Sequence, residues 1–571
     1  PSPYEIESGK SFEALDKLPA HLRGAPRPWV KVSYTLADGQ EFLLITCEYH
    51  NPTDQPFKLR PFSFLRVEGE VTRGKAYDGA LAYAWNPWWG GAYGAYDLGA
   101  EPAAAGKGGE LTLPAKGMVT QRTRLYTAAD LTTLLALVAA DLKQPTRPVQ
   151  LTLRDAGGTP VAGALLSVRV GGQPAGQART DVAGVWLGRV PAGALSITAN
   201  AYGYTPGTIA IEDGGAPAAT TQDAAALPLA MTLETPGRVA LTLKDEAGRL
   251  LPAKVQFFGQ DGTPSPDFFP NSGEERARNE AFTANGTVTQ ALPPGKYLLQ
   301  ISRGPEYEAQ RLPVTIVAGQ TVALPVTLKR VLDTRGWISA EFHNHSTVSG
   351  YQELFYVYPY SKDALVDGSS YASPRGRVLN LLAEGIEFAP ATEHNHSFSY
   401  QPLIADLGAA AWLKSAPGVG LTAGRRHTIN HQNAFPVPWT PGRMDGGILQ
   451  RPEHIGQLMW MQAWPDGTAP AFVSLVHPAD TPPQVTRGAI LELMDIESLL
   501  DGKALPGRDP HALNWLARLS AGYRITAVAG TGRYDNFNGS GELRNWVASP
   551  TDDPAALDPL VVAREAMAGR V

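Results

Sequence analysis

The chain has 571 residues and a formal net charge of -6, and this length predicts several domains. Its 49 basic residues against 55 acidic residues give no basic field for nucleic acid or an anionic membrane surface, so no nucleic-acid partner is expected. The single cysteine, Cys47, excludes an intrachain disulfide, and the chain has no run of about 18 apolar residues that would predict a transmembrane segment.

Residues 1–147 are predicted to form an N-terminal β-sandwich with a connector helix. Residues 29–34 and 42–49 alternate apolar and polar side chains, as half-buried strands do, and the turn-forming stretch 51–54 follows them. The 59 glycines and 48 prolines of the chain favour many short strands joined by turns. Two packed sheets are the expected outcome.

An aromatic and glycine-rich stretch, residues 83–96, shows neither a strand period nor a helix period. Its Trp85, Trp88 and Trp89 are candidates for stacking on a glycan or for binding a cell-surface protein. The alternative is a long loop that packs its own aromatic side chains against the sandwich.

One helix is expected after this sandwich, over residues 127–138. Thr127 opens it, and an acid, Asp130, follows three residues later, as in a capping pair. We expect this helix to pack on the sandwich as a connector.

An internal repeat follows the helix. Residues 149–157 are echoed by residues 239–248, and residues 190–195 are echoed by residues 292–297. Each copy carries alternating strands, a turn at an aspartate, and a Pro-Gly hairpin. The repeat predicts two tandem β-sandwiches of the same kind.

These two modules, residues 148–235 and 236–335, resemble the carboxypeptidase-regulatory-like, prealbumin-type β-sandwich that is common in secreted and cell-surface proteins. The resemblance implies an exported protein of the bacterial cell envelope or exterior, whose export signal has been removed. Modules of this type space or dock other domains and seldom catalyse.

Beyond Arg335, strand-like and helical stretches alternate, which predicts an α/β domain over residues 336–571. Nine of the 11 histidines lie in this region. His343 and His345 stand two residues apart at the end of a predicted strand. Both imidazoles can therefore face the same side and bind one ion.

Six predicted strands of this region end in polar side chains that can ligate a metal. After His343 and His345, the candidates are Glu393, His394, His431, His477, Asp495 and Asp535. A parallel barrel-like sheet gathers all its C-terminal strand ends around one mouth, so we expect these side chains to converge.

Four short motifs carry a family resemblance: His343-Asn344-His345-Ser346, Thr392-Glu393-His394-Asn395, His431-Gln432-Asn433 and Val476-His477-Pro478. With a closing segment at 544–547, they make the domain similar to the PHP (polymerase and histidinol phosphatase) superfamily and to its CehA/McbA-like, carbaryl-hydrolase-like branch. The resemblance implies a distorted seven-stranded β/α-barrel. It also implies two or three divalent ions and hydrolysis of phosphoesters or carbamate-type esters.

Several positions depart from the family pattern. An expected aspartate falls on Ser349-Gly350, an acidic ligand falls on Arg426, and a late Asp and His fall on Arg533 and Asp535. An arginine offers no lone pair and repels a nearby cation. The ligands that remain suffice for one divalent ion, with zinc preferred and manganese or iron as alternatives: His343, His345, Glu393, His394, His431, His477 and Asp535.

Two functions follow from this pattern. In the first, the barrel is a partly degenerate metallohydrolase that serves as a structural or docking subunit of a cell-envelope assembly. In the alternative, it is an active metal-dependent ester hydrolase, in which His394 or His477 moves protons while Arg426 and Arg533 hold an anionic small molecule. The loss of several carboxylate positions favours the first.

Overall fold

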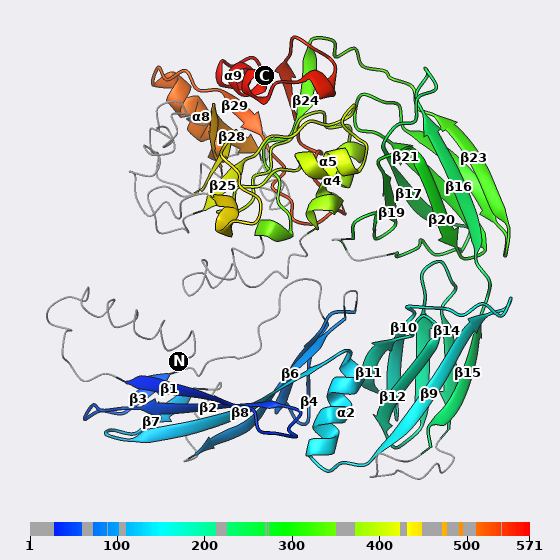
Figure 1. The fold of residues 1–571 in the computed structure, drawn as a ribbon, viewed down its shortest axis with the longest axis vertical. Coiled ribbons are helices and arrows are strands. Elements are labelled where there is room, and N and C mark those ends of the chain that lie inside the picture. The colour runs from blue at the N-terminus through cyan, green and yellow to red at the C-terminus, as the bar shows by residue number, and fades with distance from the viewer. Residues whose placement is uncertain are drawn as a thin grey trace.

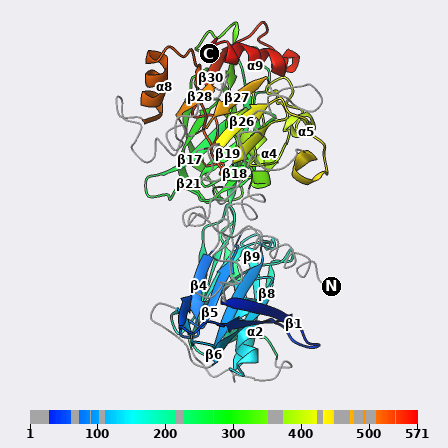
Figure 2. The same cartoon turned by 90° about the vertical axis from the view of Figure 1, so that its left-hand side faces the viewer.

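The structure is a computed structural model that describes residues 28–59, 72–87, 90–101, 110–212, 225–268, 271, 273–349, 372–422, 431–447, 471–476, 490–494, 510–537 and 539–571. Figure 1 shows these residues as an N-terminal sheet, two β-sandwiches and a mixed C-terminal region. In Figure 2 the N-terminal sheet and the first sandwich lie in one half, and the second sandwich and the C-terminal region lie in the other. No helix among the described residues is long and apolar enough to cross a membrane.

The N-terminal part consists of a six-stranded sheet in the order β1-β2-β8-β6-β5-β4 and a separate β3-β7 pair. The strands are β1 (Trp29–Thr35), β2 (Leu43–His50), β3 (Phe57–Leu59), β4 (Thr72–Ala76), β5 (Leu81–Trp85), β6 (Ala92–Glu101), β7 (Leu111–Leu113) and β8 (Met118–Ala128). Cys47 of β2 lies in an apolar core together with residues of β7 and β8.

The aromatic stretch is a hairpin, because β5 and β6 pair antiparallel with Trp85 opposite Ala92. The sequence prediction of a stretch without strand character was wrong here. Trp85 is only 1% exposed and packs with Tyr126 and Leu134, so its ring does not face solvent for a glycan to stack on. Trp88 and Trp89 lie outside the described residues.

The connector helix α2 (Leu131–Asp141) begins later than predicted, since Thr127 still belongs to β8. Its N-cap is Asp130, whose carboxylate accepts a hydrogen bond from Thr133 N at 2.7 Å. The acid that was expected inside the first turn is therefore the cap itself. Apolar residues of α2 pack on β5, β6 and β8, and the helix also contacts the first sandwich.

Two sandwiches of matching topology follow, as the sequence repeat predicts. The first contains β9 (Thr146–Asp155), β10 (Leu165–Val170), β11 (Gln173–Arg179), β12 (Val185–Pro191), β13 (Leu195–Asn200), β14 (Gly207–Ile211) and β15 (Leu227–Leu233). The second contains β16 (Gly237–Lys244), β17 (Ala253–Gln260), β18 (Arg276–Ala277), β19 (Glu280–Thr283), β20 (Thr287–Leu292), β21 (Gly295–Ser302), β22 (Gln310–Ile316) and β23 (Thr321–Thr327).

The equivalence of the two sandwiches extends to their hydrogen bonds. The orders β12-β9-β15 and β20-β16-β23 correspond, each with one antiparallel and one parallel neighbour for the central strand. The turn aspartates also correspond: Asp155 accepts from Thr159 N at 2.9 Å, and Asp245 accepts from Arg249 N at 2.8 Å. The repeated aspartate is thus a turn-forming residue in both copies.

The C-terminal region mixes short strands with helices. Its elements are β24 (Trp337–Ala340), α4 (Pro374–Ala383), α5 (Gln401–Asp406), β25 (Val419–Thr422), β26 (His431–Phe435), η2 (Met444–Gly447), β27 (Phe472–Leu475), β28 (Ile490–Met494), α8 (Pro510–Ser520), β29 (Ala527–Ala529), β30 (Asn545–Ala548), η3 (Pro554–Ala556) and α9 (Pro559–Met567). The strands form a β24-β30 pair and a sheet in the order β25-β26-β27-β28-β29.

Four isolated parallel bridges link further segments to these strands: Ala340 with Phe388, Phe388 with Lys414, His394 with Gly420, and Asn344 with Arg533. The described residues include few helices and no continuous barrel of named strands. The β-rich, multidomain and sandwich parts of the predicted fold class are therefore confirmed.

His431 was predicted at the end of a strand, but it begins β26, which runs antiparallel to both β25 and β27. It pairs with Thr422, the last residue of β25. Because the direction reverses, the start of β26 lies at the same edge of the sheet as the end of β25.

Candidate functional site

His343 and His345 follow β24 and direct the same ring atom toward each other. Their Nε2 atoms lie 2.9 Å apart, and both residues are buried at 1% exposure. The extended chain places side chains two residues apart on one side, which is the arrangement that the sequence predicted.

Two further rings surround His345. The His394 ring lies 4.3 Å from it at 70°, and the Tyr534 ring stacks on it at 4.7 Å and 15°. Tyr534 belongs to no sequence motif, although its neighbours Arg533 and Asp535 are both candidate site residues. Three imidazoles and one phenol therefore form a compact aromatic group.

Ser349 determines which nitrogen of His345 faces His343. Its hydroxyl donates to Glu393 Oε2 at 2.6 Å, because a carboxylate can only accept. The Ser349 hydroxyl oxygen accepts from His394 N at 2.9 Å, and it lies 3.1 Å from His345 Nδ1. With the serine proton already used, His345 Nδ1 must be the donor. In the neutral ring, His345 Nε2 then carries the lone pair and faces His343.

Glu393 was predicted as a metal ligand, but in the structure its two oxygens accept hydrogen bonds from five protein donors. These are Ser346 N at 2.9 Å, Ser346 Oγ at 2.6 Å, Ser349 N at 3.2 Å, Ser349 Oγ at 2.6 Å and Tyr400 Oη at 2.9 Å. Burial raises the pKa of Tyr400 well above its usual value, so this phenol remains a donor. Glu393 therefore acts on His345 through the Ser349 hydroxyl, which lies between the carboxylate and His345 Nδ1.

A second buried carboxylate, Glu341, lies beside His343. It accepts from His343 N at 2.8 Å, from Thr531 N at 3.1 Å and from the Thr531 hydroxyl. Burial raises its pKa to about 7, although these hydrogen bonds act in the opposite direction. Glu341 thereby connects the strand of His343 with the segment that follows β29.

Gly532 allows this segment to approach His343 closely. Its N–H donates to His343 O at 3.0 Å, and its φ is +62°. A Cβ at this position would lie 3.1 Å from His343 Cε1. A larger residue would therefore be strained and would push against the imidazole.

Arg377 of α4 is fully buried and holds two site segments together. It donates to His345 O at 2.9 Å, to Arg533 O at 2.9 Å and to Asp535 O at 2.9 Å, and also to Asn380 Oδ1 at 3.0 Å. Burial lowers its pKa, and the surrounding acidic groups oppose that shift. No sequence motif had indicated Arg377, because an arginine inside an apolar helix has no recognisable spacing.

The other predicted site residues are only partly described. Asp535 and Arg533 are half-buried beside this network, where Asp535 contributes to the charge environment of Arg377. The backbone of His431 lies at the start of β26, opposite Thr422, and nothing of its side chain is described. Arg426 and His477 lie outside the described residues. Within the described part of the chain, no group of three or more His, Cys, Asp or Glu residues has the geometry of a metal site.

Two of the described residues, His343 and His345, carry donor atoms of the kind that a divalent ion takes. Two imidazole nitrogens on a tetrahedral zinc ion stand about 3.3 Å apart, and the two Nε2 atoms stand 2.9 Å apart. The Nδ1 side of His345 is held by a hydroxyl and a carboxylate, which is the usual environment of a ligating histidine. At 2.9 Å the two Nε2 atoms stand at hydrogen-bond distance, so the rings would have to separate before both could bind one ion.

Comparisons with known proteins yield only remote similarities. No protein-family model matches the chain, and no curated protein matches it. Among solved structures, the Bacillus anthracis TIE protein is similar at 14% identity and a TM-score of 0.15, over 56% of this chain and 60% of that one. A Streptococcal ancillary pilin is similar at 14% identity and a TM-score of 0.20, over 33% of this chain and 63% of that one. The shaft pilin SpaA from Lactobacillus rhamnosus GG is similar at 12% identity and a TM-score of 0.19, over 33% of this chain and 99% of that one.

The chain thus spans less than two thirds of the first two of these structures. At such low TM-scores, the similarities carry no conclusion about what this chain does.

Proposed function

We propose that residues 336–571 form a PHP-like metal-binding barrel that holds one divalent ion between His343 and His345. The observation that carries the proposal is the pair of facing Nε2 atoms at 2.9 Å, with the tautomer of His345 fixed through Ser349 and Glu393. Zinc is the preferred ion, and manganese and iron are alternatives, because imidazole suits all three.

The bridges described above support the barrel. They connect seven segments in a circuit: 337–344, 386–394, 414–422, 431–435, 472–475, 490–494 and 527–533. The bridge between Asn344 and Arg533 returns the last segment to the first. A distorted barrel with one reversed strand accounts for this circuit and for the meeting of the histidines at its mouth.

We further propose that the chain is an exported protein of the bacterial cell envelope, in which this barrel is a reduced relative of a metallohydrolase and serves as a structural or docking subunit. Glu393 supports the reduced character, since five protein donors occupy the carboxylate that would otherwise be a ligand. The two tandem sandwiches suit a spacing or docking role.

The test is the zinc content of the full chain and of three variants. We expect about one ion per wild-type chain and little or none for His343→Ala and His345→Ala, because each removes one of two converging ligands. His50→Ala is the matched control, since His50 stacks on Trp29 in the N-terminal sheet. Wild-type protein that binds no zinc, manganese or iron would refute the proposal.

Hydrolysis is the second candidate, and Arg533 is the observation that favours it. This arginine is anchored at the edge of the histidine group by the bond from Arg377 to its carbonyl, and a guanidinium can hold an anionic substrate. A bound ion would supply an acidified water molecule, and His394 lies beside His345 where it could move a proton.

A phosphodiester and an aryl carbamate, each assayed with added zinc or manganese, test the hydrolase. Turnover that is lost in Arg533→Gln, with ion content unchanged, would establish the hydrolase over the docking subunit. The absence of turnover in metal-loaded wild type would refute it.

A further inference from the structure

The second sandwich reaches the histidine site through one loop, formed by Asn271, Gly273 and Glu274. The carbonyl of Asn271 accepts from Asn536 N at 2.7 Å and from Phe537 N at 3.0 Å. The carbonyl of Gly273 accepts from Asn536 Nδ2 at 3.0 Å. Asn536 is fully buried, so this loop anchors the backbone and side chain of a site segment.

The anchored segment carries Tyr534 and Asp535 directly before Asn536. Tyr534 stacks on the His345 ring at 4.7 Å, and its carbonyl accepts from Ala372 N at 2.6 Å. Asp535 O accepts from Arg377, which also holds His345 O. The residue that this loop holds, Asn536, therefore lies two positions after Tyr534, whose ring stacks on His345.

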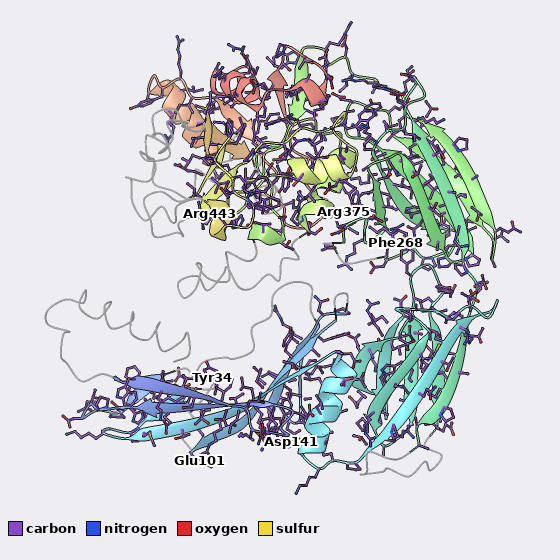
Figure 3. The ribbon with its side chains drawn as sticks, in the orientation of Figure 1. Tyr34, Glu101, Asp141, Phe268, Arg375 and Arg443 are labelled. Atoms are coloured by element: carbon purple, nitrogen blue, oxygen red, sulfur yellow. The ribbon has the colours of Figure 1, made fainter. Side chains whose placement is uncertain are left out.

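The same loop also holds the start of α4. Glu274 accepts from the hydroxyl of Ser373, the N-cap of α4, and pairs with Arg375 at 3.1 Å. A Cβ at Gly376 would lie 2.7 Å from Asn536 Nδ2 and 3.2 Å from Glu274 Cα. The loop, the helix and the site segment therefore pack so closely that no side chain fits at Gly376. Figure 3 marks Arg375 at this boundary between α4 and the second sandwich.

We propose that the second sandwich is a positioning part of the histidine site, and that its residues Asn271, Gly273 and Glu274 set the placement of Tyr534 and Asp535 against His345. This role goes beyond spacing or docking, because Asn271 and Gly273 accept hydrogen bonds from the site segment itself. Its consequence for metal binding rests on the proposed function, whereas the coupling between loop and ring does not.

The experiment compares two full-length variants with wild type. Asn536→Ala removes the side-chain bond to Gly273 O. Arg249→Gln removes a different contact between the same parts, the guanidinium 5.2 Å over the Trp412 ring, together with the pairing of Arg249 with Asp245 inside the second sandwich. The readouts are the dissociation constant for zinc and the His345 imidazole resonances, which sense the ring current of Tyr534.

We expect Asn536→Ala to shift the His345 resonances and to weaken zinc binding about 10- to 100-fold, as loss of a supporting contact to a ligand does. Arg249→Gln should leave both within about twofold of wild type, because surface contacts contribute little. A folded Asn536→Ala protein with unchanged His345 resonances would overturn the inference. If wild type binds no zinc, the resonances still decide the coupling.

If Asn536→Ala does not fold, amide exchange on the wild-type chain decides. We expect the amides of Asn536 and Phe537 to be as protected as those in the core strands β17 and β21 of the second sandwich, because one opening event would expose both. Fast exchange at these two amides, with the sandwich still protected, would overturn the inference.

Discussion

A single hydroxyl proton decides the state of His345. The Ser349 hydroxyl donates its hydrogen bond to Glu393, so its oxygen can only accept from His345 Nδ1 and from the His394 amide. A serine at this position thereby links a buried carboxylate to an imidazole without an ion pair between them. Ser346 binds the same carboxylate at the same 2.6 Å distance but does not contact His345 through its hydroxyl in the described network.

These two serines supply a matched pair of variants. Ser349→Ala should weaken zinc binding about 10- to 100-fold, since His345 loses the acceptor that fixes its tautomer. Ser346→Ala should have a smaller effect, because it removes one of five donors to Glu393 and leaves His345 in place. Isothermal titration with zinc measures both, and equal losses in the two variants would contradict this role of Ser349.

At the scale of residues, local spacing predicted the facing pair of His343 and His345, because period-two geometry follows from the extended backbone alone. The role of Glu393 could not be predicted, since its donors come from three separate positions that meet only in the folded chain. The same holds for Arg377, whose backbone carbonyl partners lie 32 to 158 residues away.

At the scale of elements, a buried cluster of charged side chains joins β17, β19 and the C-cap of α4. Lys254 Nζ lies 2.6 Å from Glu384 Oε1 and 3.9 Å from Glu280 Oε1. Burial raises the pKa of Glu280 to about 7, and Lys254 opposes this shift only in part. Glu384 and Glu542 add to the rise by repulsion. The interface between the second sandwich and the C-terminal region therefore carries a carboxyl group that resists ionisation.

This group gives the interface a pH dependence of known sign. Between about pH 4.5 and 7 the folded chain keeps the Glu280 proton that the unfolded chain has released, so this group's contribution to stability falls as pH rises through that window. Glu280→Gln cannot ionise. We therefore expect its free energy of unfolding, relative to wild type, to increase between about pH 5 and pH 8, by on the order of 2 kcal/mol.

Urea unfolding at several pH values measures the effect. Glu101→Gln controls for the loss of a surface charge, because Glu101 pairs with Arg122 in solvent. A relative stability of Glu280→Gln that is constant across the window would show that Glu280 stays ionised in the folded chain.

Element types were more predictable than element limits and directions. The helix after the first sheet was expected, but its start moved because Asp130 caps it while Thr127 pairs in β8. The hairpin of β5 and β6 escaped prediction, since glycines and aromatic residues on both faces conceal the period of two. The reversal of β26 has no local signature, because strand direction depends on the connection between strands.

For the whole molecule, the second sandwich and the C-terminal region behave as one packed unit. Ala277 and Phe282 of the sandwich share an apolar cluster with Leu379 and Ala383 of α4. Arg303 of the sandwich donates to Leu382 O at 2.7 Å. The sequence repeat indicates where each sandwich lies along the chain. It does not indicate which of the two sandwiches packs on the C-terminal region.

Two shortened chains test this unit. A chain that begins at Gly237 should melt within a few degrees of the full protein, because it retains the shared apolar cluster and the buried cluster of charged side chains. A chain that begins at Gly336 should melt at a clearly lower temperature, since Leu379, Ala383 and Glu384 lose their partners. Scanning calorimetry measures both, and equal melting temperatures would show that the C-terminal region is autonomous.

The bond between Thr531 N and Glu341 has a consequence for the order of events during synthesis. It joins residues that are 190 positions apart. At about 5 to 20 residues per second, the ribosome needs roughly 10 to 40 s to deliver the second partner after the first. All strands of the second sandwich have been synthesised before that interval begins. For the first part of the interval, α4 has not been synthesised and cannot yet cover the apolar face around Phe282. A nascent chain stalled before residue 531 should thus present a folded sandwich beside an unfinished site, because the Thr531 partner of Glu341 is still missing.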